Sequence, residues 1–216
     1  MNKPLWLICQ GRSGSTTLLR ILNTIDACNI CGENMNMVAH LLDFYAHLKE
    51  TVNQPGYSQS YPGSRRPSWY NVFDFQTTTD DLRRLIVNIF RGLDYRVWGF
   101  KEIRFGLDVP YRVFERQIDD IKELFPSIKI VFLYRQDIES QVLSDWWADN
   151  VEESRELLLD QLACFALYND RHRDYTYLLS MEDMLAINGT FIEMFNFIGE
   201  AYDKDAIREI LSDGKR

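Results

Sequence analysis

A short polar segment near the start of the chain gathers four hydroxyl residues, two glycines and an arginine: Gly11-Arg12-Ser13-Gly14-Ser15-Thr16-Thr17. It follows the apolar run at residues 5–9 and precedes apolar residues at helical spacing, so it is predicted to join a buried strand directly to a helix. Such a turn points backbone N–H groups and the positive end of the helix at one spot. The segment therefore predicts a cradle for a phosphate or a similar anion. The plain alternative is a tight turn in which Ser or Thr caps the helix.

The same segment does not match the Walker A loop of kinases and NTPases. That motif is G-x-x-x-x-G-K-[ST], whereas Gly11 and Gly14 are two residues too close and no Lys follows Gly14. The strand predicted at residues 128–134 ends in Arg135 instead of the acidic residue that would hold Mg²⁺. Hydrolysis of ATP or GTP is therefore disfavoured, and a divergent P-loop nucleotide kinase or NTPase is kept as an alternative.

Arg135 is the second candidate for anion binding. It follows IKIVFLY, the clearest buried strand in the chain, and open parallel sheets bind ligands at the carboxyl ends of their strands. A guanidinium offers a fixed fork of N–H donors that suits a phosphate. Ser144 follows on a helix predicted at residues 137–148. The alternative for Arg135 is a surface ion pair with Asp137 or Glu139.

Together the two segments resemble the sulfotransferases that use 3′-phosphoadenosine 5′-phosphosulfate. In that family an element of the form [KR]-S-G-[ST]-T binds the 5′-phosphosulfate, and a strand end of the form R-x(7,8)-S binds the 3′-phosphate. The matching residues here are Arg12-Ser13-Gly14-Ser15-Thr16, and Arg135 with Ser144 after eight intervening residues. The chain looks most similar to the bacterial and carbohydrate-type branches. The segment R-K-G-x-x-G-[DN]-W of the cytosolic enzymes is absent, and the chain is short for the family.

The resemblance implies one sulfotransferase-like domain over residues 1–216. Its expected reaction moves the sulfuryl group from 3′-phosphoadenosine 5′-phosphosulfate to a hydroxyl or amine of a carbohydrate or other small-molecule acceptor and leaves adenosine 3′,5′-bisphosphate. Residues 12–17 would hold the 5′ end of the donor, while Arg135 and Ser144 would hold the 3′-phosphate. The resemblance implies no metal and leaves a homodimer open. A second alternative is a non-catalytic nucleotide-binding module that kept the cradle and lost turnover.

Three charged residues are candidates for the transfer itself. Arg12 occupies the position where the family has Lys or Arg near the moving group, and Lys101, which ends a strand predicted at residues 95–101, is similar to the family's strand-end Lys. Arg104 is a secondary candidate of the same type as Lys101. A hydroxyl acceptor needs a general base. Glu33, at a predicted strand end, resembles the glutamate base of a bacterial carbohydrate-type branch, and Glu102 is the alternative. A carboxylate base needs desolvation to raise its pKa.

The elements that must position these residues alternate between strand and helix, which predicts an α/β domain with a mainly parallel sheet. Strands are predicted at residues 5–9, 95–101, 128–134 and 176–179, and helices at 17–25, 38–52, 80–90, 111–125, 137–148, 151–170, 190–199 and 203–212. With the phosphate cradle, the expected fold is a P-loop-like three-layer α/β/α arrangement. Residues 51–77 interrupt the pattern with three prolines and six aromatics. A substrate-covering loop is predicted there, against the alternative of a packed surface loop.

Composition excludes several function classes. The 216 residues include 24 Lys and Arg against 32 Asp and Glu, for a formal charge of −8. Such a chain has no overall attraction for nucleic acid or for an anionic membrane, so a polyanionic ligand needs a local basic pocket. The first apolar run is too short for a signal peptide or a membrane span, and nothing requires the four cysteines to form disulfides. A cytoplasmic enzyme is expected.

Overall fold

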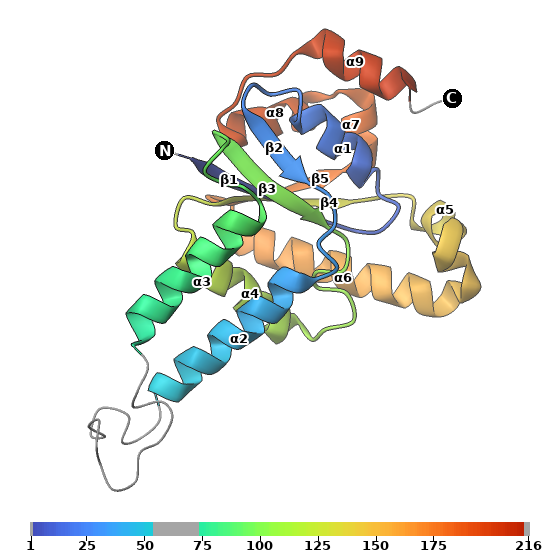
Figure 1. Ribbon diagram of the computed structural model, residues 1–216. Coiled ribbons are helices and arrows are strands. Elements are labelled where there is room, and N and C mark those ends of the chain that lie inside the picture. The colour runs from blue at the N-terminus through green and yellow to red at the C-terminus, as the bar shows by residue number, and fades with distance from the viewer. Residues whose placement is uncertain (1, 54–73, 214–216) are drawn as a thin grey trace, which may run out of the picture.

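A five-stranded parallel sheet forms the centre of the computed structural model, which describes residues 2–53 and 74–213 (Figure 1). The strands are β1 (Lys3–Cys9), β2 (Cys28–Cys31), β3 (Val97–Glu102), β4 (Lys129–Tyr134) and β5 (Thr176–Ser180). They lie in the order β2-β3-β1-β4-β5, and every neighbouring pair is parallel. All carboxyl ends therefore meet at one edge of the sheet, where the predicted site residues follow their strands.

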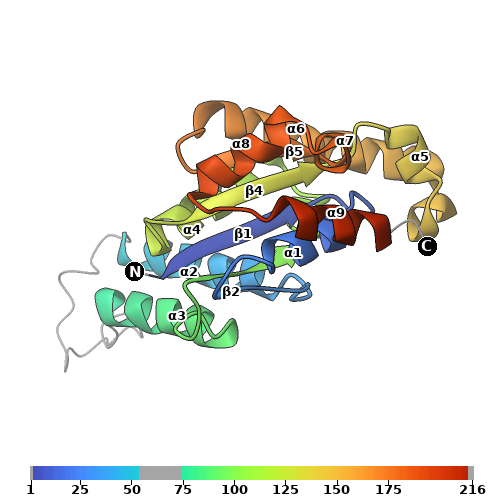
Figure 2. The same cartoon turned by 90° about the horizontal axis from the view of Figure 1, so that it is seen from above.

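Helices cover both faces of this sheet (Figure 2). One face carries α1 (Ser15–Leu22), α7 (Met181–Ala186), α8 (Gly189–Ile198) and α9 (Lys204–Asp213). The other face carries α2 (Met37–Val52), α3 (Phe75–Ile89), α4 (Tyr111–Leu124) and α6 (Val151–Arg171). After β4 come α5 (Ile138–Val142) and a 3₁₀ helix (Asp145–Asp149). The predicted α/β class with three layers is confirmed.

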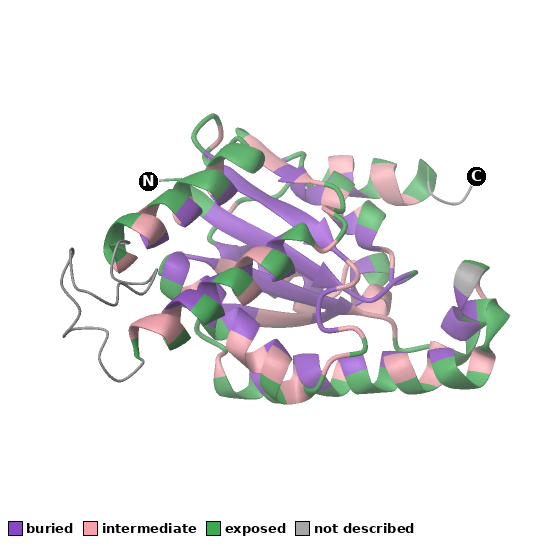
Figure 3. Ribbon diagram, turned by 60° about the horizontal axis from the view of Figure 1, so that its bottom comes forward, coloured by how far each residue is buried: buried purple, intermediate pink, exposed green. Residues whose placement is uncertain are grey.

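Strand β1 shows why its sequence is apolar throughout. Its side chains alternate between two cores: Trp6 and Ile8 belong to the core under α2, α3, α4 and α6, whereas Leu5 and Leu7 belong to the core under α1 and α8. A parallel strand covered on both faces requires apolar residues on both. Each large apolar side chain buried in this way contributes about 1.5–3 kcal/mol. The buried sheet in Figure 3 is thus a rigid frame for the loops at its carboxyl edge.

The helix predicted at residues 137–148 is wrong as a continuous element. Helix α5 ends at Val142, Ser144 is extended (φ −106°, ψ 129°), and Asp145 has a left-handed backbone with φ 55° before the 3₁₀ helix begins. A residue with positive φ cannot continue an α-helix. The break turns Ser144 and Asp145 toward the carboxyl edge of the sheet, where both line a cavity.

Two other helices differ from the sequence prediction. Helix α3 begins at Phe75 instead of residue 80, because Asp74 caps it by accepting a hydrogen bond from the backbone N–H of Thr77 at 2.6 Å. Helix α7 was not predicted; it is only six residues long and is capped by Ser180. Short helices without a sustained apolar period leave little signal in a sequence.

The predicted covering loop at residues 51–77 falls largely outside the described residues. Its first residues belong to α2 and its last to α3, and residues 54–73 are not described. The flanking residues Asn53 and Asp74 lie at the ends of α2 and α3 that point away from the carboxyl edge of the sheet (Figure 1). Within the described residues, none of the helices is long and apolar enough to cross a membrane. All four cysteines are free thiols.

Candidate functional site

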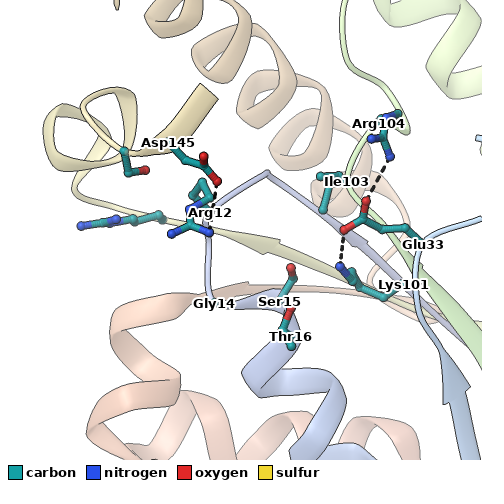
Figure 4. Close-up of a pocket in the computed structure, with 11 residues that line it drawn as sticks. Arg12, Gly14, Ser15, Thr16, Glu33, Lys101, Ile103, Arg104 and Asp145 are labelled. Atoms are coloured by element: carbon teal, nitrogen blue, oxygen red, sulfur yellow. Dashed lines mark hydrogen bonds and ion pairs between the residues drawn. The ribbon is translucent and has the colours of Figure 1, made fainter. Parts of the chain in front are cut away.

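A cavity of about 460 Å³ opens at the carboxyl edge of the sheet, where the ends of β1, β3 and β4 meet (Figure 4). It is lined by Arg12, Gly14, Ser15, Thr16, Glu33, Lys101, Ile103, Arg104, Arg135, Ser144 and Asp145. Most of the residues singled out from the sequence are therefore brought together here from five separate stretches of chain. Ile103 and Asp145 were not predicted, although each lies beside a predicted residue.

Two of the residues predicted to hold the 5′ end of the donor, at 12–17, do not line the cavity. Ser13 is fully buried, and its hydroxyl donates a hydrogen bond to the backbone carbonyl of Gln10 at 2.6 Å. Thr17 lies within the first turn of α1 and is half-buried. The hydroxyl of Ser13 thus stabilises the turn itself.

The turn before α1 has the backbone geometry of an anion cradle. Arg12 and Gly14 have positive φ angles of 62° and 77°, and a Cβ on Gly14 would lie 3.0 Å from both Met181 Cγ and Met184 Cε. Only glycine fits that position without strain. Gly14 is the N-cap of α1, and no side chain of the described residues makes a capping hydrogen bond there. The expected alternative, a helix capped by Ser or Thr, is not found, so the first N–H groups of α1 stay available to an anion.

Buried side chains tie this turn to the end of β4. The carbonyl of Gly11 accepts hydrogen bonds from Gln141 Nε2 at 2.7 Å and from Trp147 Nε1 at 3.3 Å. Gln10 Oε1 accepts from the backbone N–H of Arg135 at 3.3 Å. Trp147, which the sequence offered either for an aromatic acceptor wall or for the core, is buried in the core. Gln10 and Gln141 were not predicted; the one signal for them is a polar glutamine directly after an apolar strand. They hold the two candidate anion-binding segments in a fixed relation to each other.

The guanidinium of Arg135 keeps a hydrogen-bond donor without a partner among the described residues. Its Nε is buried and has no partner in the part of the chain that the structure describes, and its Nη2 lies 3.9 Å from Asp137 Oδ2. Buried donors without partners are rare in native proteins, and the distance to Asp137 is long for an ion pair. Glu139, the other partner considered from the sequence, is bound by Arg155 at 2.7 Å. The donor set of Arg135 thus fits an additional anion.

Ser144 lines the same cavity as Arg135. Its hydroxyl donates to the carbonyl of Gln141 at 2.6 Å. A hydroxyl rotates about its C–O bond and can redirect its proton to a ligand. Ser144 can therefore serve as acceptor in its present state and as donor to an anion bound in the cavity.

Glu33 joins two cations at the end of β3 (Figure 4). Lys101 Nζ donates to Glu33 Oε1 at 2.6 Å, and Arg104 Nη1 donates to Glu33 Oε2 at 3.0 Å. Burial acts to raise the pKa of the Glu33 carboxyl, but the hydrogen bonds and charges of Lys101 and Arg104 outweigh it and hold the pKa below its ordinary value. The desolvation expected of a base is present, yet in this state Glu33 is a weak base.

Glu102 has a different task from Glu33. It is fully buried, and its Oε2 accepts the backbone N–H groups of Asn34 and Asn36 at 3.1 and 2.9 Å. Its Oε1 accepts those of Ile103 and Arg104 at 3.0 and 3.1 Å. With both oxygens occupied and no share in the cavity lining, Glu102 fixes the loops that carry Glu33 and Arg104. Of the two glutamates, Glu33 alone is placed to reach a ligand.

The cavity is positively charged although the protein is acidic. Four cationic side chains and two carboxylates line it. Arg12 Nη1 lies 3.6 Å from Asp145 Oδ2, with about half of each side chain exposed. A local basic pocket of this kind attracts polyanions. Across residues 2–53 and 74–213, no three His, Cys, Asp or Glu side chains gather as metal ligands.

Residues 4–184 match the model of the sulfotransferase family. The crystal structure of sulfotransferase STF1 from Mycobacterium tuberculosis aligns over 98% of this chain and 71% of its own, with a TM-score of 0.48 and 10% identity. For sulfotransferase STF9 from Mycobacterium avium the shares are 97% and 67%, with a TM-score of 0.45 and 12% identity. No curated protein matches the chain significantly.

Proposed function

The chain belongs to the sulfotransferase family, and from this premise we propose that it transfers a sulfuryl group from 3′-phosphoadenosine 5′-phosphosulfate to a hydroxyl or amine of a carbohydrate or other small molecule. One observation carries the proposal. The turn before α1 and the end of β4, which are far apart in the sequence, line a single cavity together with Lys101 and Glu33. That cavity offers two groups of hydrogen-bond donors that can bind anions, and beside them the ammonium of Lys101 and the carboxylate of Glu33.

The two anionic ends of 3′-phosphoadenosine 5′-phosphosulfate match the N–H and O–H groups that the cavity offers. The N–H groups at the start of α1, with Arg12, Ser15 and Thr16, would hold the 5′-phosphosulfate. The buried Nε of Arg135, with Ser144, would hold the 3′-phosphate. Ser13 and Thr17 would contribute through backbone N–H groups, because neither side chain lines the cavity.

When bound, the donor supplies an activated sulfuryl group on its 5′-phosphate. Transfer of such a group, like phosphoryl transfer, depends mainly on positioning and on neutralising charge. Arg12 would neutralise charge from the side of the turn, and Lys101 from the end of β3. Lys101 is only 7% exposed, and in so dry an environment its charge acts strongly on a nearby anion.

Glu33 would take the proton of the acceptor. In the ligand-free state it is held by Lys101 and Arg104. When sulfuryl oxygens compete for the ammonium of Lys101, Glu33 loses its closest cation and its pKa rises. The base would thus become stronger when the donor is in place.

The experiment that tests this function is thermal unfolding with adenosine 3′,5′-bisphosphate, with ATP plus Mg²⁺ alongside. A ligand at about 100 times its Kd adds roughly 2.7 kcal/mol of apparent stability, which for a chain of this length shifts Tm by about 5–10 °C. We expect the bisphosphate to produce this shift. A larger shift with ATP plus Mg²⁺ would contradict the proposal and favour a nucleotide kinase or NTPase. Bisphosphate binding without transfer to any acceptor would favour a non-catalytic binding module.

A further inference from the structure

Arg104 lines the cavity beside Glu33, with which it forms an ion pair. We propose that Arg104 forms a site that binds an anionic group of the acceptor, a carboxylate, a sulfate or a phosphate, next to the hydroxyl or amine that receives the sulfuryl group. The inference rests on the proposed function, because it names the class of acceptor for the same cavity. It is carried by the unused donors of Arg104, by the way its backbone is fixed, and by its position.

The guanidinium of Arg104 is only partly engaged. Both of its side-chain contacts run through a single nitrogen: Nη1 lies 3.0 Å from Glu33 Oε2 and 3.4 Å from Glu102 Oε1. Within the described residues, Nε and Nη2 have no partner, and 41% of the side chain is exposed. A guanidinium with free N–H donors binds a carboxylate, sulfate or phosphate through two parallel hydrogen bonds.

The site is held in place before a ligand arrives. Glu102, fully buried, accepts the backbone N–H of Arg104 at 3.1 Å and also contacts its guanidinium. The remaining bonds of Glu102 go to backbone N–H groups of the neighbouring loops. Arg104 is thus fixed at its backbone and at one nitrogen of its side chain. A group held in this way loses little entropy on binding.

The position of Arg104 indicates which ligand it meets. Figure 4 shows Arg104 and Lys101 on opposite sides of Glu33, with the turn that carries Arg12 further away. Arg12 and Arg135 are assigned to the donor, and Lys101 is deeply buried beside Glu33. Arg104 is the remaining cation of the cavity lining. An anion bound by it lies next to the carboxylate that would take the acceptor proton.

Binding an anion at Arg104 also changes Glu33. Lys101 and Arg104 are the two cations that face Glu33, and both lower its pKa. An anionic acceptor that competes for Arg104 weakens the contact between Arg104 and Glu33, just as the sulfuryl donor weakens the contact between Lys101 and Glu33. An anionic acceptor therefore strengthens the base that deprotonates it, whereas a neutral acceptor leaves Arg104 on Glu33.

The test compares acceptors that differ in one anionic group: phenyl β-D-glucuronide with phenyl β-D-glucoside, 4-hydroxybenzoate with 4-hydroxybenzyl alcohol, and phenyl 6-phospho-β-D-glucoside with its unphosphorylated form. Thermal shifts are measured on protein saturated with adenosine 3′,5′-bisphosphate, and kcat/KM is measured with the full donor. We expect the anionic member to be favoured at least about tenfold, the factor expected for one hydrogen bond to a charged group. The three pairs distinguish carboxylate from phosphate and sugar from aromatic acceptors.

The variants are Arg104→Gln, Arg104→Lys and, as a matched control, Arg91→Gln at an exposed arginine paired with Asp94 outside the cavity. Arg104→Gln should bring the ratio of kcat/KM between the anionic and the neutral acceptor close to one. Arg104→Lys should restore part of this preference, and Arg91→Gln should leave it unchanged. The inference is overturned if no anionic compound stabilises the bisphosphate-loaded protein, or if Arg104→Gln keeps the preference. Failure of the proposed function is a separate result, namely no binding of the bisphosphate by the unmodified protein.

Discussion

Lys101 Nζ donates a hydrogen bond to Glu33 Oε1 at 2.6 Å, across 68 positions of sequence. The contact follows from the sheet: β2 and β3 are parallel neighbours, with Cys31 paired to Phe100, so Glu33, just after β2, meets Lys101, near the carboxyl end of β3. A buried ammonium and a carboxylate neutralise each other in the absence of a ligand. We interpret the pair as the resting state of a site in which each partner has its own role once donor and acceptor bind.

Removing the proposed base separates chemistry from binding. We expect Glu33→Gln to lower kcat at least about 100-fold, the usual size of a general-base contribution. Its affinity for adenosine 3′,5′-bisphosphate should stay within a few-fold of the original, since Glu33 is not part of the donor cradle. Steady-state kinetics and calorimetric titration give the two quantities. Normal turnover by Glu33→Gln would exclude Glu33 as the base.

The charge around Glu33 predicts a pH dependence. Because its pKa lies below the ordinary value, Glu33 stays deprotonated to lower pH than a free glutamate, and the acidic limb of the kcat/KM profile should lie correspondingly low. Arg104→Gln removes one of the cations that lower this pKa, so the acidic limb should move to higher pH. A neutral acceptor is used for both proteins, so that the acceptor itself does not interact with Arg104. If the acidic limb stayed at the same pH or moved to lower pH in Arg104→Gln, its assignment to Glu33 would be contradicted.

Glu102 should contribute strongly to stability, because its buried carboxylate accepts backbone N–H groups of the loops after β2 and β3. In Glu102→Gln, the new amide presents N–H donors to backbone N–H donors in a fully buried position. Two lost or opposed hydrogen bonds of this kind cost about 2–4 kcal/mol, measurable as a lower midpoint of urea unfolding. Glu139→Gln is the control and should cost much less, because the Glu139 side chain is 70% exposed and its ion pair with Arg155 lies at the surface. Equal losses in the two variants would contradict the structural role of Glu102.

Asp145 is an anion in a cavity that is proposed to bind anions. Its Oδ2 lies 3.6 Å from Arg12 Nη1. A polyanionic ligand that binds Arg12 therefore competes with the Asp145 carboxylate and stays close to its negative charge. We expect Asp145→Asn to tighten the binding of adenosine 3′,5′-bisphosphate about three- to tenfold, in line with one screened like-charge contact. Asp149→Asn changes the same charge on the same 3₁₀ helix outside the cavity lining and should leave the affinity unchanged. Weaker binding in Asp145→Asn would show that its carboxylate contacts the ligand favourably.

The sequence contained enough to predict the frame of this site. The continuous apolar runs of β1 and β4 have few interpretations other than buried parallel strands, and the residues after them meet at the carboxyl edge by topology alone. Arg12, Lys101 and Arg135 could therefore be assigned to one edge before any distance was known. Their roles toward a ligand stay predictions.

Other features depend on contacts that sequence patterns do not encode. The helix breaks before Asp145, which has a left-handed backbone. On either side of the break, Gln141 and Trp147 make tertiary hydrogen bonds to the carbonyl of Gly11. Glu33 and Glu102 have the same chemistry and similar positions after strands. Only burial and the four backbone N–H groups around Glu102 distinguish the carboxylate that fixes the loops from Glu33, the carboxylate that lines the cavity.

The most direct test of the central claim, that one cavity holds both phosphate groups of the nucleotide, is a calorimetric comparison of two ligands. Adenosine 3′,5′-bisphosphate and adenosine 5′-monophosphate are titrated into the unmodified protein, Arg135→Ala, and Arg173→Ala, a control at an exposed arginine paired with Asp170. We predict that the unmodified protein and Arg173→Ala bind the bisphosphate at least about tenfold more tightly than the monophosphate. Arg135→Ala should bind both ligands equally. Equal binding of the two ligands by the unmodified protein, or a preference that survives Arg135→Ala, would contradict the account.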